Sequence, residues 1–181
     1  PGNNAGDCVE YKAEGDWSGA AFLLSAAAVA GEVKITGLRK DSCQADRAIL
    51  DVLAQVGADI LWDDKIINCR KNELNAFDFD ATDCPDLFPP LAALAANCAG
   101  TSVIRGTSRL LGKESNRSVS IMETLKQCGV DAWVDADLMY IKGAEINAAT
   151  VHSFHDHRIA MMASVLALNA DGPVEILESS S

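Results

Sequence analysis

The sequence has few basic residues for its length. Among 181 residues, 15 Lys and Arg stand against 26 Asp and Glu, which gives a formal net charge of −11. A nucleic-acid partner needs a basic surface for its phosphate backbone, so we expect no nucleic acid. A small phosphorylated ligand stays possible, because it needs only a few converging cations and helix N-termini.

Long apolar runs and a secretion signal are also lacking. The longest apolar stretch, residues 20–30, is too short to cross a bilayer and is interrupted by Ser25, so we expect no membrane partner. No N-terminal segment combines a basic start, an apolar run and a small-residue cleavage site. The six cysteines form no CxxC pair, and we therefore expect reduced, mostly buried thiols and a cytoplasmic protein.

What the sequence does have is an internal repeat. Three stretches each combine a helix of small and apolar residues, a glycine and an alternating strand, and they cover residues 17–35, 86–104 and 157–176. Such helices are expected to be buried on all sides. Their glycines, Gly31, Gly100 and Gly172, are 69 and 72 residues apart, and each is expected to be the left-handed residue that ends a helix.

The second part of the repeat is found twice. Residues 46–60 resemble residues 116–132, and apolar side chains share one face of each predicted helix. A hairpin-like pair of strands follows each time, at 60–62 with 66–69 and at 132–134 with 138–141. The third repeat stops after its first strand. The sequence therefore predicts an α/β fold in a single lobe of related units, at about residues 14–80, 81–150 and 151–181, with the third incomplete.

One group of polar residues, Lys113 to Arg117, stands at the entry to an amphipathic helix. Lys113 and Arg117 are four residues apart, so on a helix they share a face, and the positive end of the helix dipole favours an anion there. Glu114, between two cations, would favour its carboxylate form and could still exchange a proton with a ligand. A solvated helix start with a charge pair explains the pattern equally well.

A second group begins the apolar helix of the third repeat. Arg158 in its first turn needs an anionic partner, which Asp156 could provide, or Asp156 could be only a helix N-cap. The histidines His152, His155 and His157 also suggest a zinc site, as in a metal hydrolase, but no Cys or carboxylate ligand set is spaced to complete it.

A third candidate, Asp86, follows Pro85 at the start of the apolar helix of the second repeat. The plain alternative for Asp86 is a helix N-cap. Because the three groups recur at corresponding helix starts, a pseudo-threefold lobe would bring these starts to one end. That end would attract phosphate and carboxylate groups.

Five motifs together resemble the series that is typical of the EPSP synthase (3-phosphoshikimate 1-carboxyvinyltransferase) family. They agree with it in order and spacing, and they are EGDWSGAA (residues 14–21), SCQAD (42–46), CPD (84–86), KESNR (113–117) and DHRIAM (156–161). The resemblance covers nearly the whole chain from Glu14 to Leu177. Asn116 and Gly19 depart from it, since the family usually has Asp and Ser at these positions.

The resemblance implies a fold and an activity. Members of this family have two lobes, each an inside-out α/β barrel of three βαβαββ units, with the substrates in the cleft between them. They transfer the enolpyruvyl group of phosphoenolpyruvate to the 5-hydroxyl of shikimate 3-phosphate and release phosphate, a step of aromatic amino acid biosynthesis. No metal or organic cofactor is required. The partners implied are these two substrates and the complementary lobe, and the chain alone is expected to be inactive.

The resemblance also implies residue roles. Asp86 would be the base for the 5-hydroxyl, and Glu114 would handle the proton at the methylene carbon. The residues that would bind the substrates are Lys113, Arg117, His157 and Arg158. The alternative to an enzyme is a non-catalytic module that binds small anions on the same fold, but the acids Asp86 and Glu114 argue against it.

Overall fold

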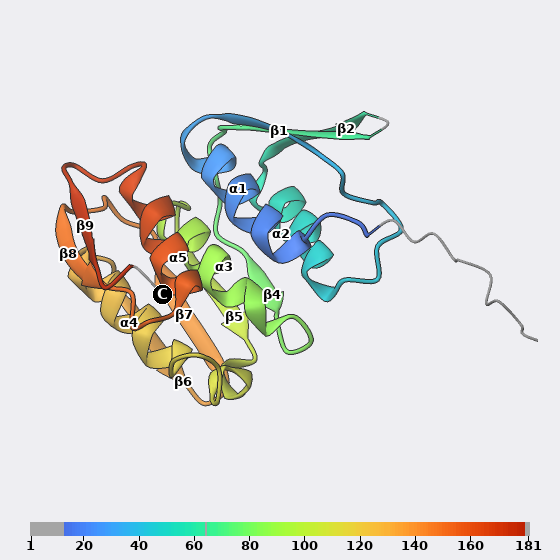
Figure 1. Ribbon diagram of the computed structural model, residues 1–181. Helices are drawn as coiled ribbons and strands as arrows, with labels where there is room; N and C mark the ends of the chain where they lie inside the picture. Colours follow the sequence, from blue (N-terminus) through green and yellow to red (C-terminus); the bar gives the residue numbers. More distant parts are fainter. Residues whose placement is uncertain (1–12, 64, 180–181) are drawn as a thin grey trace, which may run out of the picture.

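Three buried helices form the centre of the protein. The computed structural model describes residues 13–63 and 65–179, and in it α1 (Trp17–Ala30), α3 (Phe88–Ala96) and α5 (His157–Ala167) pack side by side (Figure 1). Every residue of α3 is buried, as its composition of Ala, Leu, Phe and Pro predicts. The same prediction is wrong for α1 and α5, because Leu23 on α1 and Ser164 on α5 remain exposed.

Two amphipathic helices pack against this centre. In α2 (Ile49–Val56), which follows the 3-10 turn η1 (Ala45–Ala48), Ile49, Val52, Leu53 and Val56 are buried. In α4 (Arg117–Gln127), Ile121 and Leu125 are buried together with Ser120 and Thr124. The predicted apolar faces are therefore confirmed, and α4 lies against both α3 and α5.

The strands form three separate sheets outside the helices (Figure 1). The first contains β1 (Glu32–Thr36), β3 (Ile66–Arg70) and β2 (Asp59–Asp63), paired antiparallel in that order. The second has the order β4 (Asp78–Asp80), β5 (Thr101–Arg105), β7 (Leu138–Lys142), β6 (Ala132–Asp135), and only β4 and β5 are parallel. Both predicted hairpins, β2–β3 and β6–β7, are confirmed.

The third sheet has only two strands, β8 (Ala149–His152) and β9 (Val174–Leu177), which are parallel. The order β4, α3, β5, α4, β6, β7 gives the second unit the βαβαββ pattern, while the third unit shows β8, α5 and β9. The predicted α/β fold of repeated units is therefore confirmed. Counted by sheet pairing, the second and third units begin at β4 and β8.

The glycine prediction is wrong: only Gly100 has a positive φ, 105°, and α3 already ends at Ala96 with Asn97 as its C-cap. Gly31 has an extended φ of −165° because α1 continues directly into β1, and Gly172 is not left-handed either. A Cβ on Gly172 would come within 3.0 Å of the Ala148 Cβ, so close packing explains that glycine. The left-handed glycines that end helices are Gly57 after α2 and Gly129 after α4, with φ of 85° and 80°.

The five cysteines that the structure describes are free thiols. Cys43 is exposed, and the other four are buried. Burial raises the pKa of the Cys84 and Cys98 thiols to about 12, which makes both poor nucleophiles. Cys8 lies outside the described residues. Within residues 13–63 and 65–179, no helix combines the length and the apolarity that a membrane crossing needs.

Candidate active site

The residues of the candidate site come together where the first turns of the central helices meet the start of α4. Asp86 lies in the 3-10 turn η2 (Pro85–Leu87), directly before α3. Arg117 is the first residue of α4, and Arg158 is the second residue of α5. Together with three neighbours they form a group that we call the ion cluster: Asp86, Lys113, Glu114, Arg117, Asp156 and Arg158.

Asp86 contacts three cations. Its Oδ1 accepts hydrogen bonds from Lys113 Nζ at 3.2 Å and Arg117 Nη1 at 2.7 Å, and its Oδ2 lies 3.3 Å from Arg158 Nη2. Burial alone would raise the pKa of Asp86, but the charge of Arg158 and the hydrogen bonds of Lys113 and Arg117 hold it below its ordinary value. The N-cap alternative for Asp86 is wrong, because neither η2 nor α3 has a side-chain cap.

Arg117 is the buried centre of the ion cluster, with 1% of its side chain exposed. Its Nε donates to Asp156 Oδ2 at 2.7 Å, its Nη2 reaches Asp156 Oδ1 at 3.3 Å, and Nη2 also donates to Glu114 Oε2. Burial would lower the pKa of Arg117, but these carboxylates, Asp156 foremost, outweigh it and raise the pKa. A guanidinium can be buried here because three carboxylates surround it.

Asp156 is fully buried and joins two helices. Its Oδ1 caps α5 by accepting from the Arg158 backbone N–H at 3.0 Å, and its Oδ2 accepts from Ser115 Oγ at 3.1 Å as well as from Arg117. The N-cap interpretation is confirmed. The expected ion pair with the Arg158 side chain is wrong, because the cation that Asp156 binds is Arg117. Burial would raise the pKa of Asp156, but the hydrogen bond and charge of Arg117 hold it below its ordinary value.

Lys113 and Glu114 are not helical. Helix α4 begins only at Arg117, so the expectation that Lys113 and Arg117 share a helical face is wrong. The non-helical segment lets both Lys113 and Glu114 reach the ion cluster from one side. The side chains of Lys113 and Arg158 are 31% and 15% exposed, against 1% for Arg117, so these two are the cations that an incoming anion meets first.

The carboxyl group of Asp46 lies beside the ion cluster, although the sequence did not identify Asp46 as a site residue. Asp46 in η1 is buried and accepts a hydrogen bond from Ser18 Oγ in the first turn of α1. Burial raises the pKa of Asp46, and the nearby charge of Asp86 adds to this, while Ser18 and Arg158 oppose it. The only signal in the sequence was its place in the SCQAD motif. Through Asp46 and Ser18, the first unit reaches the same end of the bundle as α3 and α5, as the repeat predicts.

The three histidines do not join the ion cluster. His157 is exposed and, among the described residues, makes no ion pair or side-chain hydrogen bond. His155 Nε2 and His152 Nδ1 instead face Glu178 Oε2, at 3.3 and 4.0 Å. In the part of the chain that the structure describes, no three His, Cys, Asp or Glu side chains are placed to hold a metal ion.

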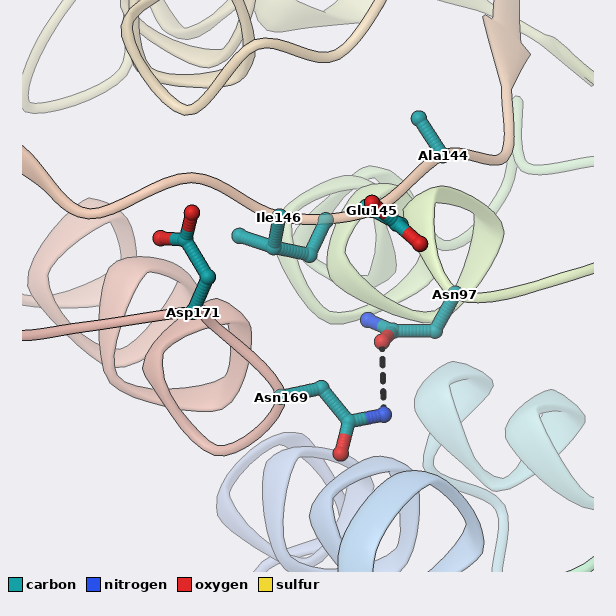
Figure 2. Close-up of a pocket in the computed structure, with 6 residues that line it drawn as sticks. All are labelled: Asn97, Ala144, Glu145, Ile146, Asn169 and Asp171. Atoms are coloured by element: carbon teal, nitrogen blue, oxygen red, sulfur yellow. Dashed lines mark hydrogen bonds between the residues drawn. The ribbon is translucent and has the colours of Figure 1, made fainter.

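The opposite end of the helix bundle is different in character. A hollow of about 470 Å³ lies there, and Asn169 Nδ2 donates to Asn97 Oδ1 at 3.1 Å beside it. Figure 2 shows the residues that line this hollow. Glu145 and Asp171 also line this hollow, and the C-terminal ends of helices carry partial negative charge. This end is therefore unsuited to an anionic ligand, and the ion cluster is the better candidate for one.

Comparisons with known proteins point to one family. The model of the family described as EPSP synthase (3-phosphoshikimate 1-carboxyvinyltransferase) matches residues 1–181. A 3-phosphoshikimate 1-carboxyvinyltransferase of Brachyspira hyodysenteriae is 37% identical over 99% of this chain and 44% of its own length. One of Pyrococcus abyssi is 39% identical over 90% of this chain and 40% of its own length.

A solved structure gives the same result for the fold. The EPSP synthase of Acinetobacter baumannii superposes with a TM-score of 0.83 at 27% identity, over 92% of this chain and 42% of that one. The chain thus spans 40% to 44% of the length of these three relatives.

Proposed function

Because this chain belongs to the EPSP synthase family, we propose that it is part of an enzyme that transfers the enolpyruvyl group of phosphoenolpyruvate to shikimate 3-phosphate and releases phosphate. The observation that carries the proposal is the ion cluster, in which Asp86 lies against Lys113, Arg117 and Arg158 at the first turns of the central helices. Such a place can bind an anion and offers a carboxylate beside it.

The cations have the task of binding. Lys113 and Arg158 are partly exposed and can contact the carboxylate and phosphate of phosphoenolpyruvate from two sides. Arg117 lies behind them and adds its charge, and it reaches the ligand if Glu114 turns away. His157 is exposed next to Arg158 and can donate to the same phosphate.

The two acids move protons. Asp86 takes the proton of the 5-hydroxyl as its oxygen forms a bond to C2 of phosphoenolpyruvate, and Glu114 delivers a proton to C3. Glu114, now a carboxylate, then takes a proton back from C3 as phosphate leaves C2, which restores the double bond. Glu114 is half exposed, so it can exchange protons with both ligand and solvent. General acid–base steps of this kind contribute roughly 10²–10⁴-fold to a rate.

We also propose that residues 1–181 are one lobe whose third unit is completed by further structure. Two observations support this. An apolar groove of about 240 Å³ lies between α1 and α5, with Phe22, Leu23, Met161 and Leu168 among its lining residues. In addition, β5 pairs with strands on both sides, whereas β9 pairs only with β8 among the described residues. In the second unit, α4 packs against the central helices and β7 pairs with β5. A helix and a strand at the equivalent places of the third unit would cover the apolar groove and pair with β9.

The complementary lobe is the other partner that we propose, and the cytoplasm is the compartment. The buried free thiols of this chain fit a reducing environment. In a two-lobed enzyme the ion cluster would supply the phosphoenolpyruvate side of the cleft, and the other lobe would bind most of shikimate 3-phosphate. Holding both substrates together provides several kcal/mol of catalysis, so this chain alone should be inactive.

Phosphate release from phosphoenolpyruvate and shikimate 3-phosphate tests the proposal. We expect no turnover from residues 1–181 alone and measurable turnover when the complementary lobe is added. With the complementary lobe present, the Asp86→Asn variant should release phosphate about 10²–10⁴-fold more slowly. Turnover by the isolated chain would overturn the half-site proposal, and no turnover with a folded complementary lobe would favour the non-catalytic anion-binding module.

A further inference from the structure

The ion cluster neutralises itself. It contains three cations and three carboxylates, so its formal charge is zero before any ligand arrives. The two cations that face outward, Lys113 and Arg158, each contact a single carboxylate in the described structure, and in both cases it is Asp86. One side chain thus occupies both of the cations that an anionic substrate would use.

We propose that Asp86 is a built-in competitor of the anionic substrate, which must displace it from Lys113 and Arg158 and thereby frees its carboxylate to act as a base. This inference rests on the proposed function, because it takes Lys113 and Arg158 as the site of the anion. It adds an order of events, in which the base becomes available only when the anion is bound.

The geometry allows an exchange at two of the three contacts of Asp86. Arg117 is held from behind by Asp156 at 2.7 Å and is buried, so it stays in place. Lys113 comes from a non-helical segment and has a long flexible stem, and Arg158 is partly exposed. An anion that binds these two side chains leaves Asp86 with Arg117 alone.

The electrostatics give the direction of the change. The charged groups around Asp86 come from three places. Lys113 and Glu114 lie in the segment before α4, and Arg117 is the first residue of α4. Asp156 caps α5, Arg158 lies in its first turn, and Asp46 lies in η1. In the unliganded cluster the cations prevail and hold the pKa of Asp86 low. When an anion draws Lys113 and Arg158 away, burial and the nearby negative charges prevail, so the pKa of Asp86 rises and its carboxylate becomes a stronger base.

Inorganic sulfate is a suitable probe, because its two negative charges do not titrate near neutral pH. The 181-residue chain would be titrated with sodium sulfate at constant ionic strength, and binding followed by amide chemical shifts in NMR spectra. We expect Asp86→Asn to bind sulfate about tenfold more tightly than the wild type, the effect of removing one close negative charge. The matched control is Asp171→Asn, which removes an equal charge at the opposite end of the bundle (Figure 2) and should leave the affinity unchanged.

A second measurement needs no variant. The Asp86 side-chain carboxyl carbon, followed by NMR as the pH is lowered, should titrate at a higher pH in saturating sulfate than without it. Equal titration midpoints, or an Asp86→Asn variant that folds and binds no tighter, would overturn the competitor role. The site itself is checked separately with Lys113→Gln and Arg158→Gln, which should each weaken sulfate binding. If neither does, the anion site of the proposed function fails, and the competitor role fails with it.

Discussion

The two ends of the central helix bundle have opposite chemistry, although α3 and α5 reach both of them. At the N-terminal ends, six charged side chains contact one another directly, and Arg117 and Asp156 among them are buried. At the C-terminal ends, a neutral hydrogen bond from Asn169 to Asn97 links the residues that follow α5 and α3. The helix dipole favours anions at the first end and disfavours them at the second.

The difference shows that the repeat supplies the scaffold, and that the segments between the helices supply the chemistry. Lys113 and Glu114 come from a non-helical segment, and Asp46 comes from a 3-10 turn. Buried charges need partners, so a loss at the N-terminal end leaves an unpaired charge, whereas a loss at the C-terminal end leaves a solvated amide. The two ends should therefore differ strongly in their response to mutation.

The largest expected difference concerns turnover. In the enzyme that contains this chain and the complementary lobe, Asp86→Asn should lower kcat about 10²–10⁴-fold, because the amide cannot accept the proton. Asp171→Asn, at the opposite end, should change kcat less than about twofold, since no group near the chemistry is altered. Steady-state phosphate release measures both. A wild-type kcat in Asp86→Asn would remove the base assignment and the functional contrast between the two ends.

The second difference concerns stability. Asp156→Ala removes the N-cap of α5 and leaves Arg117 buried with one carboxylate fewer, which should lower the free energy of unfolding by about 3–5 kcal/mol. Asp171→Ala loses one hydrogen bond from the Ala148 backbone N–H and should cost about 1 kcal/mol. Urea unfolding followed by circular dichroism gives both values. If both variants lost the same free energy of unfolding, burial of the charges would not explain the difference between the two ends.

The sequence was sufficient for features that rest on local patterns. The apolar faces of α2 and α4 and the hairpins β2–β3 and β6–β7 follow from periodicity within ten or fifteen residues. The charged residues of the ion cluster were also identifiable, because Asp86, Glu114 and Arg117 stand at the starts of otherwise apolar or amphipathic helices.

What the sequence could not give was the choice of partners. Asp156 pairs with Arg117, 39 residues away, and not with its neighbour Arg158, because α4 and α5 pack together and place the guanidinium of Arg117 against the first turn of α5. Asp46 was missed for the same reason, since only the packing of the first unit brings it near Asp86. The exposed sides of α1 and α5 were mispredicted because composition does not show which neighbours cover a helix.

The third expected difference is in the response to acid. The pKa of Asp156 is lower in the folded than in the unfolded chain, so its contribution to stability is present above about pH 4 and is lost as the pH falls through the folded value. Asp156→Asn should therefore have a lower free energy of unfolding than the wild type at pH 5. Between pH 5 and pH 3 its free energy of unfolding should fall by less than that of the wild type. Asn169→Ala removes no ionisable group, so its free energy of unfolding should change with pH as steeply as that of the wild type. Unfolding in urea at a series of pH values measures these slopes, and a wild-type slope in Asp156→Asn would contradict the assignment.

The smallest effect should come from the amide pair at the C-terminal end. Asn169→Ala removes the hydrogen bond to Asn97 Oδ1, but the atoms are exposed and water can replace the lost donor. Asn97 also keeps its own bond from Nδ2 to the Ala93 carbonyl at 2.9 Å, so α3 should end as before. We expect the free energy of unfolding to fall by no more than about 1 kcal/mol. A double-mutant cycle with Asn97→Ala should give a coupling energy between the two side chains of about 0.5 kcal/mol or slightly more. A coupling above about 2 kcal/mol would mean that this end holds the helices together as firmly as the ion cluster does, and the contrast between the two ends would then be one of charge alone.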